Sequence, residues 1–142
     1  MADVDGLKLV NDHLGHEAGD TLLCRAAHLL QAHIRKEDCL ARIGGDEFVI
    51  LFACPGAVVR KRLAAIRQAL LHRRQDSDLP VELSFGVAGS DGGVMDAEEL
   101  LRRADVAMLR AKKRRRAASH ARIRAWLERH TGREVTGDDP RL

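Results

Sequence analysis

Aromatic side chains are scarce in this chain of 142 residues. They make up 3% of the sequence, and tyrosine is absent. Proteins that bind single-stranded nucleic acid without sequence preference stack the bases on aromatic rings. We therefore expect no nucleic acid among the partners of this chain.

Long apolar runs and paired cysteines are missing as well. No run approaches the roughly 20 residues that span a bilayer, and the short, acidic start at residues 1–5 does not resemble a signal peptide. We therefore expect a cytoplasmic protein without a membrane partner. The cysteines are isolated and odd in number, at Cys24, Cys39 and Cys54, so neither a disulfide framework nor a zinc site is predicted.

What remains is a globular composition. Apolar residues make up 45% of the chain and charged residues 32%, which is typical of one folded domain with a core of its own. The net charge is +3, and the basic run at residues 112–116 concentrates it. Such a run is usually a solvated helix end or a nucleic-acid patch, but the phosphates of a small molecule would use the same charges.

Hydrophobic periodicity predicts an α/β, α+β-type layered domain with a central, mainly antiparallel sheet flanked by helices. Asp20 is expected to cap the first predicted helix. The predicted helices cover residues 21–34, 58–72 and 96–115, with another around residues 123–127. The predicted strands lie within residues 39–43, 48–52 and 81–88.

The most informative segment is residues 42–48, with the sequence RIGGDEF. Two runs of strand-forming residues flank Gly44 and Gly45, which predicts a β-hairpin with the glycines at its turn. Glycine tolerates positive φ and has no Cβ, so the turn would offer bare backbone to a phosphate. Asp46 and Glu47 follow with oxygen ligands suited to Mg²⁺. The alternative is an ordinary turn with two solvated acids.

A second acidic point, at Asp3, lies beside apolar, strand-like sequence. The surrounding residues fit neither an EF-hand loop nor a zinc-protease helix. If Asp3 ends a strand next to the hairpin, Asp3 and Asp46 would be able to share a divalent metal, as in two-metal phosphoryl transfer.

Five segments, in order, resemble the GGDEF domain family. They are DVDGLKLVND at residues 3–12, GHEAGD at 15–20, RIGGDEF at 42–48, SFGVA at 84–88 and ADVAM with the following Ala-Lys at 104–112. The resemblance implies a nucleotidyl-cyclase-like fold and diguanylate cyclase activity, in which two GTP condense to cyclic di-GMP with release of pyrophosphate. It also implies a homodimer, because each domain holds one GTP and each 3′-hydroxyl attacks the α-phosphorus held by the partner.

The resemblance further assigns metal and catalytic residues. Asp3, Asp46 and the carbonyl of Val4 match the ligands of Mg²⁺ (or Mn²⁺). Glu47 matches a carboxylate that binds a second metal or assists deprotonation. Lys8 matches a cation beside the phosphates and completes the expected catalytic set with Asp46 and Glu47.

Substrate contacts are implied in the same way. The matching positions are Asn11, His16, Asp20, Gly44, Gly45, Lys112 and Arg116. Asn11 and Asp20 would accept hydrogen bonds from the guanine N1–H and N2–H₂ groups, although Asp20 also suits a helix cap. His16 would lie near the substrate, and a structural histidine in a turn fits equally well. Lys112 and Arg116 would bind phosphates.

Arg35 and Asp38 match the R-x-x-D inhibitory site of the family, where intercalated product dimer binds. An Arg and an Asp at this spacing are common by chance, but their distance from Gly44 matches the family. This pair motivates a second hypothesis, in which the chain is a catalytically inactive receptor for cyclic di-GMP or GTP. A third hypothesis is a dimerisation module with a dead site. The cyclase is the leading hypothesis because the acids of the motif are intact, at Asp3, Asp46 and Glu47.

The start and end of the chain depart from the family pattern. Only Met1 and Ala2 precede Asp3, where the family has a helix and most of a strand, so neighbouring backbone groups would need other partners. We expect a GGDEF domain over residues 1–117 that lacks these elements, followed by a C-terminal helical tail over residues 118–142. One interpretation is that the chain is a fragment or starts from a wrongly placed reading frame. The alternative is that the helix around Trp126, or a strand from another chain, covers the gap.

Overall fold

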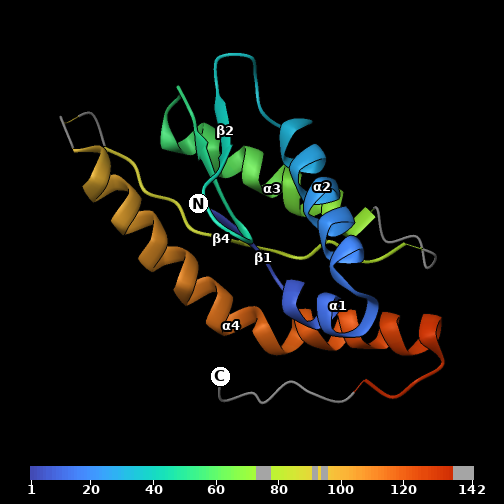
Figure 1. Ribbon diagram of the computed structural model, residues 1–142. Coiled ribbons are helices and arrows are strands. Elements are labelled where there is room, and N and C mark those ends of the chain that lie inside the picture. Colours follow the sequence, from blue (N-terminus) through green and yellow to red (C-terminus); the bar gives the residue numbers. More distant parts are fainter. Residues whose placement is uncertain (73–77, 91–92, 94–95, 136–142) are drawn as a thin grey trace.

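The computed structural model describes residues 1–72, 78–90, 93 and 96–135. One antiparallel sheet with the strand order β2-β3-β1-β4 is flanked by helices (Figure 1). The strands are β1 (Ala2–Val4), β2 (Cys39–Arg42), β3 (Glu47–Leu51) and β4 (Leu83–Phe85). The helices are α1 (Leu7–Leu14), α2 (His16–Gln31), α3 (Gly56–His72) and α4 (Ala97–Thr131). The predicted fold class is confirmed.

Strand β1 lies in the interior of the sheet although it is only three residues long. Asp3 stands opposite Glu47 of β3 on one side and opposite Ser84 of β4 on the other. Just before the strand, Met1 and Gly86 exchange backbone hydrogen bonds of 2.7 and 2.9 Å. Ala2 and Val4, the neighbours of Asp3 in β1, are fully buried, so this strand places the Asp3 carboxylate inside the domain.

The core is a single apolar cluster that joins the sheet to every helix. In Figure 1 helix α4 runs past β4 and β1, and α1 lies beside its C-terminal half. Buried members of the cluster include Val10, Leu22, Leu30, Ile66, Ile123 and Leu127. The C-terminal half of α4 is therefore part of the same folded unit as the sheet.

Helix α2 begins at His16, not at Thr21 as the sequence predicted. Gly15 separates α1 from α2 and has a φ of 86°, a conformation that glycine adopts without strain. The chain can therefore reverse at Gly15 and start the second helix at once. Asp20 lies inside α2 and is exposed, so its predicted role as N-cap is wrong.

Helix α4 continues well beyond residue 115, where the sequence predicted that it would end. No glycine or proline interrupts residues 97–131, and Gly132, with a φ of 65°, caps the end in a left-handed conformation. The expected boundary between residues 117 and 118 falls within this helix, and the division into domain and tail stays a prediction. Residues 136–142 of the expected tail lie outside the described residues.

None of the helices in the described part of the chain has the length and apolar character needed to cross a membrane.

Candidate functional site

Asp3 is a buried carboxylate in the middle of the sheet, with an exposed fraction of 3%. The Lys112 ammonium donates to its Oδ2 at 2.7 Å, while its buried Oδ1 has no hydrogen-bond partner among the described residues. Burial raises the pKa of Asp3 to about 6, against the opposing effect of Lys112. A buried acceptor without a partner is unusual in a folded protein. Asp3 thus retains one oxygen that can accept a hydrogen bond or bind a cation.

Asp46 reaches the same place from the hairpin. The Val4 N–H donates to the Asp46 carbonyl at 2.9 Å, which fastens the turn to β1. The Asp46 Oδ2 lies 3.8 Å from the Lys112 ammonium, the same group that bonds Asp3. The two acids are far apart in the sequence but converge on one cation. Their role as metal ligands stays a prediction.

The predicted hairpin turn is present between β2 and β3. Its backbone is held by Arg42, whose guanidinium donates to the Gly44 carbonyl at 3.1 Å and to the Gly45 carbonyl at 2.8 Å. Neither glycine has a positive φ, so the turn does not use this freedom of glycine. The missing side chain matters at Gly44, where a Cβ would lie 3.0 Å from Oε2 of Glu47, whereas Gly45 faces open space. No local pattern in the sequence predicts this role of Arg42.

Asn11 is packed against the backbone of α2. A Cβ added at Gly19 would collide with the Asn11 side chain, so glycine is needed for this close approach. The Oδ1 of Asn11 is buried and has no hydrogen-bond partner among the described residues. Asp20, the next residue after Gly19, is exposed. The arrangement leaves acceptor atoms on both residues, and their assignment to guanine stays a prediction.

The remaining cations expected near the substrate differ in their surroundings. Lys8 and His16 are exposed on α1 and α2, and Arg116 is half-buried on α4. Within the described part of the chain, no hydrogen bond or ion pair joins Lys8 or His16 to Asp3 or Asp46. Among the described contacts, Lys112 is the expected cation that reaches both acids.

Asp38 of the expected inhibitory site is engaged in structural contacts. Its side chain is 1% exposed and is held by the Arg62 guanidinium. It also accepts from the backbone N–H groups of Arg35 at 2.9 Å and Ala53 at 3.3 Å. The Arg35 N–H is the main cause of a lowered pKa of Asp38, with further contributions from Arg62 and Ala53. The Arg35 guanidinium is exposed and lies 3.7 Å from Glu37. The inhibitory role of Arg35 and Asp38 stays a prediction.

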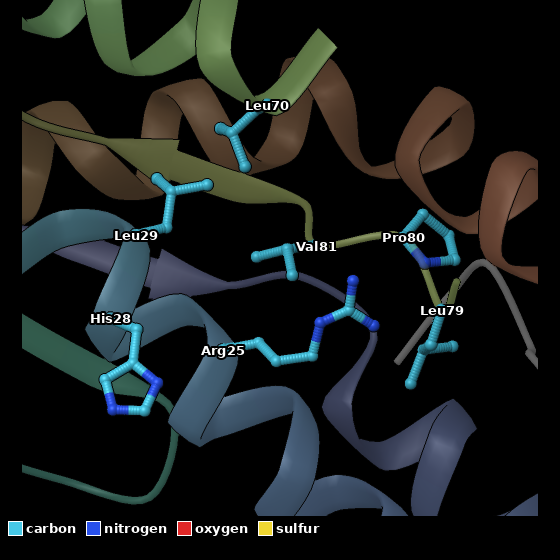
Figure 2. A pocket seen from close by; sticks show the side chains of 7 residues that line it. All are labelled: Arg25, His28, Leu29, Leu70, Leu79, Pro80 and Val81. Atoms are coloured by element: carbon cyan, nitrogen blue, oxygen red, sulfur yellow. The ribbon is translucent and has the colours of Figure 1, made fainter. Parts of the chain in front are cut away.

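A separate hollow of about 110 Å³ lies elsewhere, between α2, α3 and the segment leading into β4 (Figure 2). Its lining is formed by Arg25, His28, Leu29, Leu70, Leu79, Pro80 and Val81. It shares no residue with the pair Asp3 and Asp46, so it is not part of this candidate site.

Comparisons with known proteins place the chain in a family. The model of "Diguanylate cyclase, GGDEF domain" matches residues 1–118. The bifunctional diguanylate cyclase/cyclic di-GMP phosphodiesterase MucR of Pseudomonas aeruginosa is 37% identical over 115 residues, which are 78% of this chain and 16% of MucR. Diguanylate cyclase TpbB of the same organism is 36% identical over 121 residues, 82% of this chain and 28% of TpbB. The chain thus spans less than a third of the length of these curated relatives.

Solved structures agree with this assignment. The GGDEF-only form of TpbB has a TM-score of 0.71 and 34% identity, covering 81% of this chain and 70% of that one. The GGDEF domain of DgcB from Caulobacter crescentus, solved in complex with c-di-GMP, has a TM-score of 0.68 and 27% identity, covering 79% of this chain and 69% of that one. From the matched residues, the fold and the converging acids together, we conclude that this chain belongs to the GGDEF domain family.

Proposed function

We propose that the chain takes part in cyclic di-GMP metabolism as a diguanylate cyclase, which condenses two GTP into cyclic di-GMP and releases pyrophosphate. The observation that carries the proposal is the convergence of Asp3 and Asp46 on the ammonium of Lys112. Two carboxylates, one at a glycine turn and one on the neighbouring strand, suit a metal-bound triphosphate. Relatives named as diguanylate cyclases support the same reaction.

The donor set fits Mg²⁺ (or Mn²⁺). Mg²⁺ is usually held by one or two carboxylates together with substrate phosphates and water, and Asp3 has a buried oxygen without a partner among the described residues. Asp3, Asp46 and the Val4 carbonyl would hold the ion. When bound, it neutralises phosphate charge and favours ionisation of the attacking hydroxyl.

Lys112 is the residue that links the two acids to the substrate. Its side chain is 34% exposed, whereas that of Asp3 is 4% exposed, so the ammonium can turn from Asp3 towards a triphosphate oxygen. Lys8 and Arg116 would add positive charge near the phosphates. Glu47, which lies over Gly44, would bind a second metal or help to deprotonate the 3′-hydroxyl.

Base recognition falls to Asn11 and Asp20 in this proposal. Their side-chain oxygens would accept from the guanine N1–H and N2–H₂ groups, which adenine lacks in this pattern. The buried Oδ1 of Asn11 has no partner among the described residues, so its capacity to accept a hydrogen bond is unused. His16 would border the same site. GTP would therefore be favoured over ATP.

A second copy of the chain completes the reaction. One bound GTP cannot cyclise with itself, so each copy would supply one nucleotide in a homodimer. The product, cyclic di-GMP, would bind at Arg35 and Asp38 only if Asp38 exchanged its contact with Arg62. Binding of c-di-GMP by the DgcB domain supports recognition of this ligand within the family.

The test is to incubate the purified chain with GTP and Mg²⁺ and to measure cyclic di-GMP by chromatography. Asp46→Asn should abolish product formation, while the control Glu98→Gln, at an exposed position in the first turn of α4, should retain it. Absence of product from folded wild type at high protein concentration would reject the cyclase. If that protein still bound cyclic di-GMP, the receptor hypothesis would replace it.

A further inference from the structure

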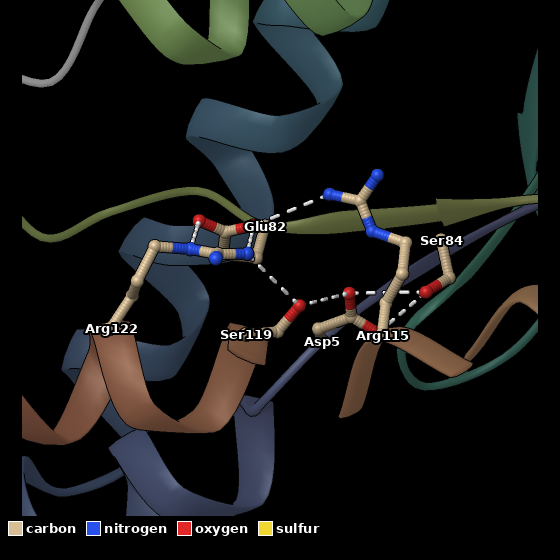
Figure 3. A network of polar contacts seen from close by, with 6 residues as sticks. All are labelled: Asp5, Glu82, Ser84, Arg115, Ser119 and Arg122. Carbon is tan, nitrogen blue, oxygen red and sulfur yellow. Dashed lines mark hydrogen bonds and ion pairs between the residues drawn. The ribbon is translucent and has the colours of Figure 1, made fainter. Parts of the chain in front are cut away.

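A buried polar network joins the C-terminal half of α4 to the end of β1 (Figure 3). Asp5 directly follows β1 and is 1% exposed. Its carboxylate accepts a hydrogen bond of 2.9 Å from Ser84 on β4 and one of 3.2 Å from Ser119 on α4. Hydrogen bonds of this kind compensate the cost of burying a carboxylate. Asp5 is therefore tied both to the sheet and to the helix.

Glu82 forms the second half of the network. Its backbone carbonyl accepts from the Asp5 N–H at 2.9 Å, so Asp5 and Glu82 extend the β1–β4 ladder by one step. The Glu82 side chain is 3% exposed and binds the Arg122 guanidinium through two bonds, of 2.6 and 2.8 Å. Arg115 lies 3.7 Å away and adds a second cation. Bidentate Arg–carboxylate pairs are strong and fix geometry.

Ile123 adds a steric contact next to the network. It packs on Gly6, where any Cβ would collide with the Ile123 side chain and where φ is 77°. Ser119, Arg122 and Ile123 are spaced so that they lie on one face of a helix. We call Ser119, Arg122 and Ile123 the α4 clasp. It holds the Asp5–Gly6 segment and Glu82 together from one side.

The α4 clasp lies outside the segment that the family model matches, which ends at residue 118. Strand β1, by contrast, is only three residues long, and it pairs with β3 through two positions and with β4 through three. A strand of three residues lies at the lower limit of strand length, so contacts beyond its end matter for its position. The α4 clasp contacts Asp5, which lies two residues after Asp3 and directly follows the C-terminal end of β1.

We propose that Arg122 and Ser119 are positioning residues for the nucleotide site. They fix Glu82 and Asp5, and through this pair they fix the register of β1, so that Asp3 stays beside Asp46. Neither residue contacts Asp3; they act through the backbone that connects Asp3 to Asp5. The inference rests on the proposed function in so far as Asp3 serves the nucleotide.

The first test measures amide hydrogen exchange of the protein without ligand. Arg122→Gln removes the bidentate partner of Glu82 and should speed exchange within residues 2–5 while α2 and α3 keep their protection. Arg122→Lys retains the charge and should give an intermediate rate. Ser119→Ala should shift the same segment more weakly. Arg129→Gln, at an exposed position near the end of α4, should behave as wild type.

The second test measures the affinity for a fluorescent GTP analogue in the presence of Mg²⁺, at a temperature where every variant is folded. Loss of a group bonded directly to a metal ligand typically costs ~10–100-fold in metal affinity or activity. Because Arg122 acts through the intervening backbone, Arg122→Gln should bind up to about 10-fold more weakly, with partial rescue in Arg122→Lys. Leu127→Val trims a fully buried side chain of the same helix and serves as the control for a purely structural loss.

Any of three results would overturn the proposal. The first is a wild-type rate of exchange within residues 2–5 in Arg122→Gln, and the second is wild-type nucleotide affinity in that variant. The third is a loss of affinity in Leu127→Val as large as that in Arg122→Gln, at a matched loss of Tm. Neither readout needs turnover. If wild-type protein makes no cyclic di-GMP while Arg122→Gln has the expected effects on exchange and affinity, the proposed function is rejected and the positioning role is supported.

Discussion

Replacing Gly86 by alanine should displace α4 from the sheet. A Cβ at Gly86 would lie 2.8 Å from the Met108 Cα, and closer still to the Ala104 carbonyl oxygen and the Met108 nitrogen. Comfortable carbon–carbon contacts begin at roughly 3.5 Å, so the helix backbone would have to retreat by at least about 0.7 Å. The colliding atoms belong to the backbone of a long helix, which cannot rotate away as a side chain can.

The expected cost is at the upper end for overpacking, about 3 kcal/mol of unfolding free energy. For a domain of this size such a loss lowers Tm by about 10 °C. Lys112 lies one helical turn beyond Met108, so its 2.7 Å bond to Asp3 should break as well. The Gly86→Ala variant should therefore lose stability and nucleotide affinity together.

Thermal denaturation followed by circular dichroism measures the effect. Gly45→Ala is the matched control, because a Cβ there meets nothing within 4 Å and the φ is not positive. Its Tm should stay within about 2 °C of wild type. A Gly86→Ala protein as stable as this control would refute the close contact between α4 and the end of β4.

Three further substitutions test separate parts of the site. Because the pKa of Asp38 is lowered in the folded protein, the Asp38 carboxylate stabilises the fold above the ordinary aspartate pKa of ~4, and this stabilisation is lost as the pH falls through the lowered pKa. Asp38→Asn should therefore be less stable than wild type at pH 7 in urea unfolding, and the difference in stability should shrink below pH ~4. A difference that does not depend on pH would contradict this. Arg35→Ala should weaken cyclic di-GMP binding roughly tenfold or more, because a charge-assisted hydrogen bond contributes about 1.5–3 kcal/mol. Its Tm should equal that of wild type, because the Arg35 guanidinium is exposed. Unchanged affinity in calorimetry would exclude Arg35 from the product site. Lys112→Met removes the cation that neutralises Asp3 and Asp46 in the absence of metal. Mg²⁺ should therefore raise the Tm of this variant more than it raises the Tm of wild type. An equal rise of Tm in both proteins would count against a shared ion at Asp3.

The hairpin could be predicted from the sequence because its signals are local. Two runs of strand-forming residues around Gly44 and Gly45 define both strands and the turn. The places of Asp3 and Asp46 beside strand-like sequence predict their convergence only on the condition that Asp3 ends a strand next to the hairpin, and the resemblance to a family supports that condition. The start of α2 was predicted wrongly, because Asp20 has the chemistry of a cap whereas the turn depends on the conformation of Gly15.

Contacts between distant residues could not be predicted in the same way. Lys112 and Asp3 are 109 positions apart, and Arg122 and Glu82 are 40 positions apart. The basic run suggested a solvated helix end, yet the helix continues because Ile123 and Leu127, further along it, find a place in the core. Such pairings depend on how complete elements pack, which hydrophobic spacing alone does not specify.

A crystal structure of the chain with Mn²⁺ and a non-reactive GTP analogue, in which anomalous scattering locates the metal, would show whether Asp3 and Asp46 share an ion. We expect a peak at roughly 2.0–2.2 Å from carboxylate oxygens of both Asp3 and Asp46, with Lys112 turned towards the triphosphate. A metal bound elsewhere, with Asp3 still paired to Lys112, would contradict this expectation.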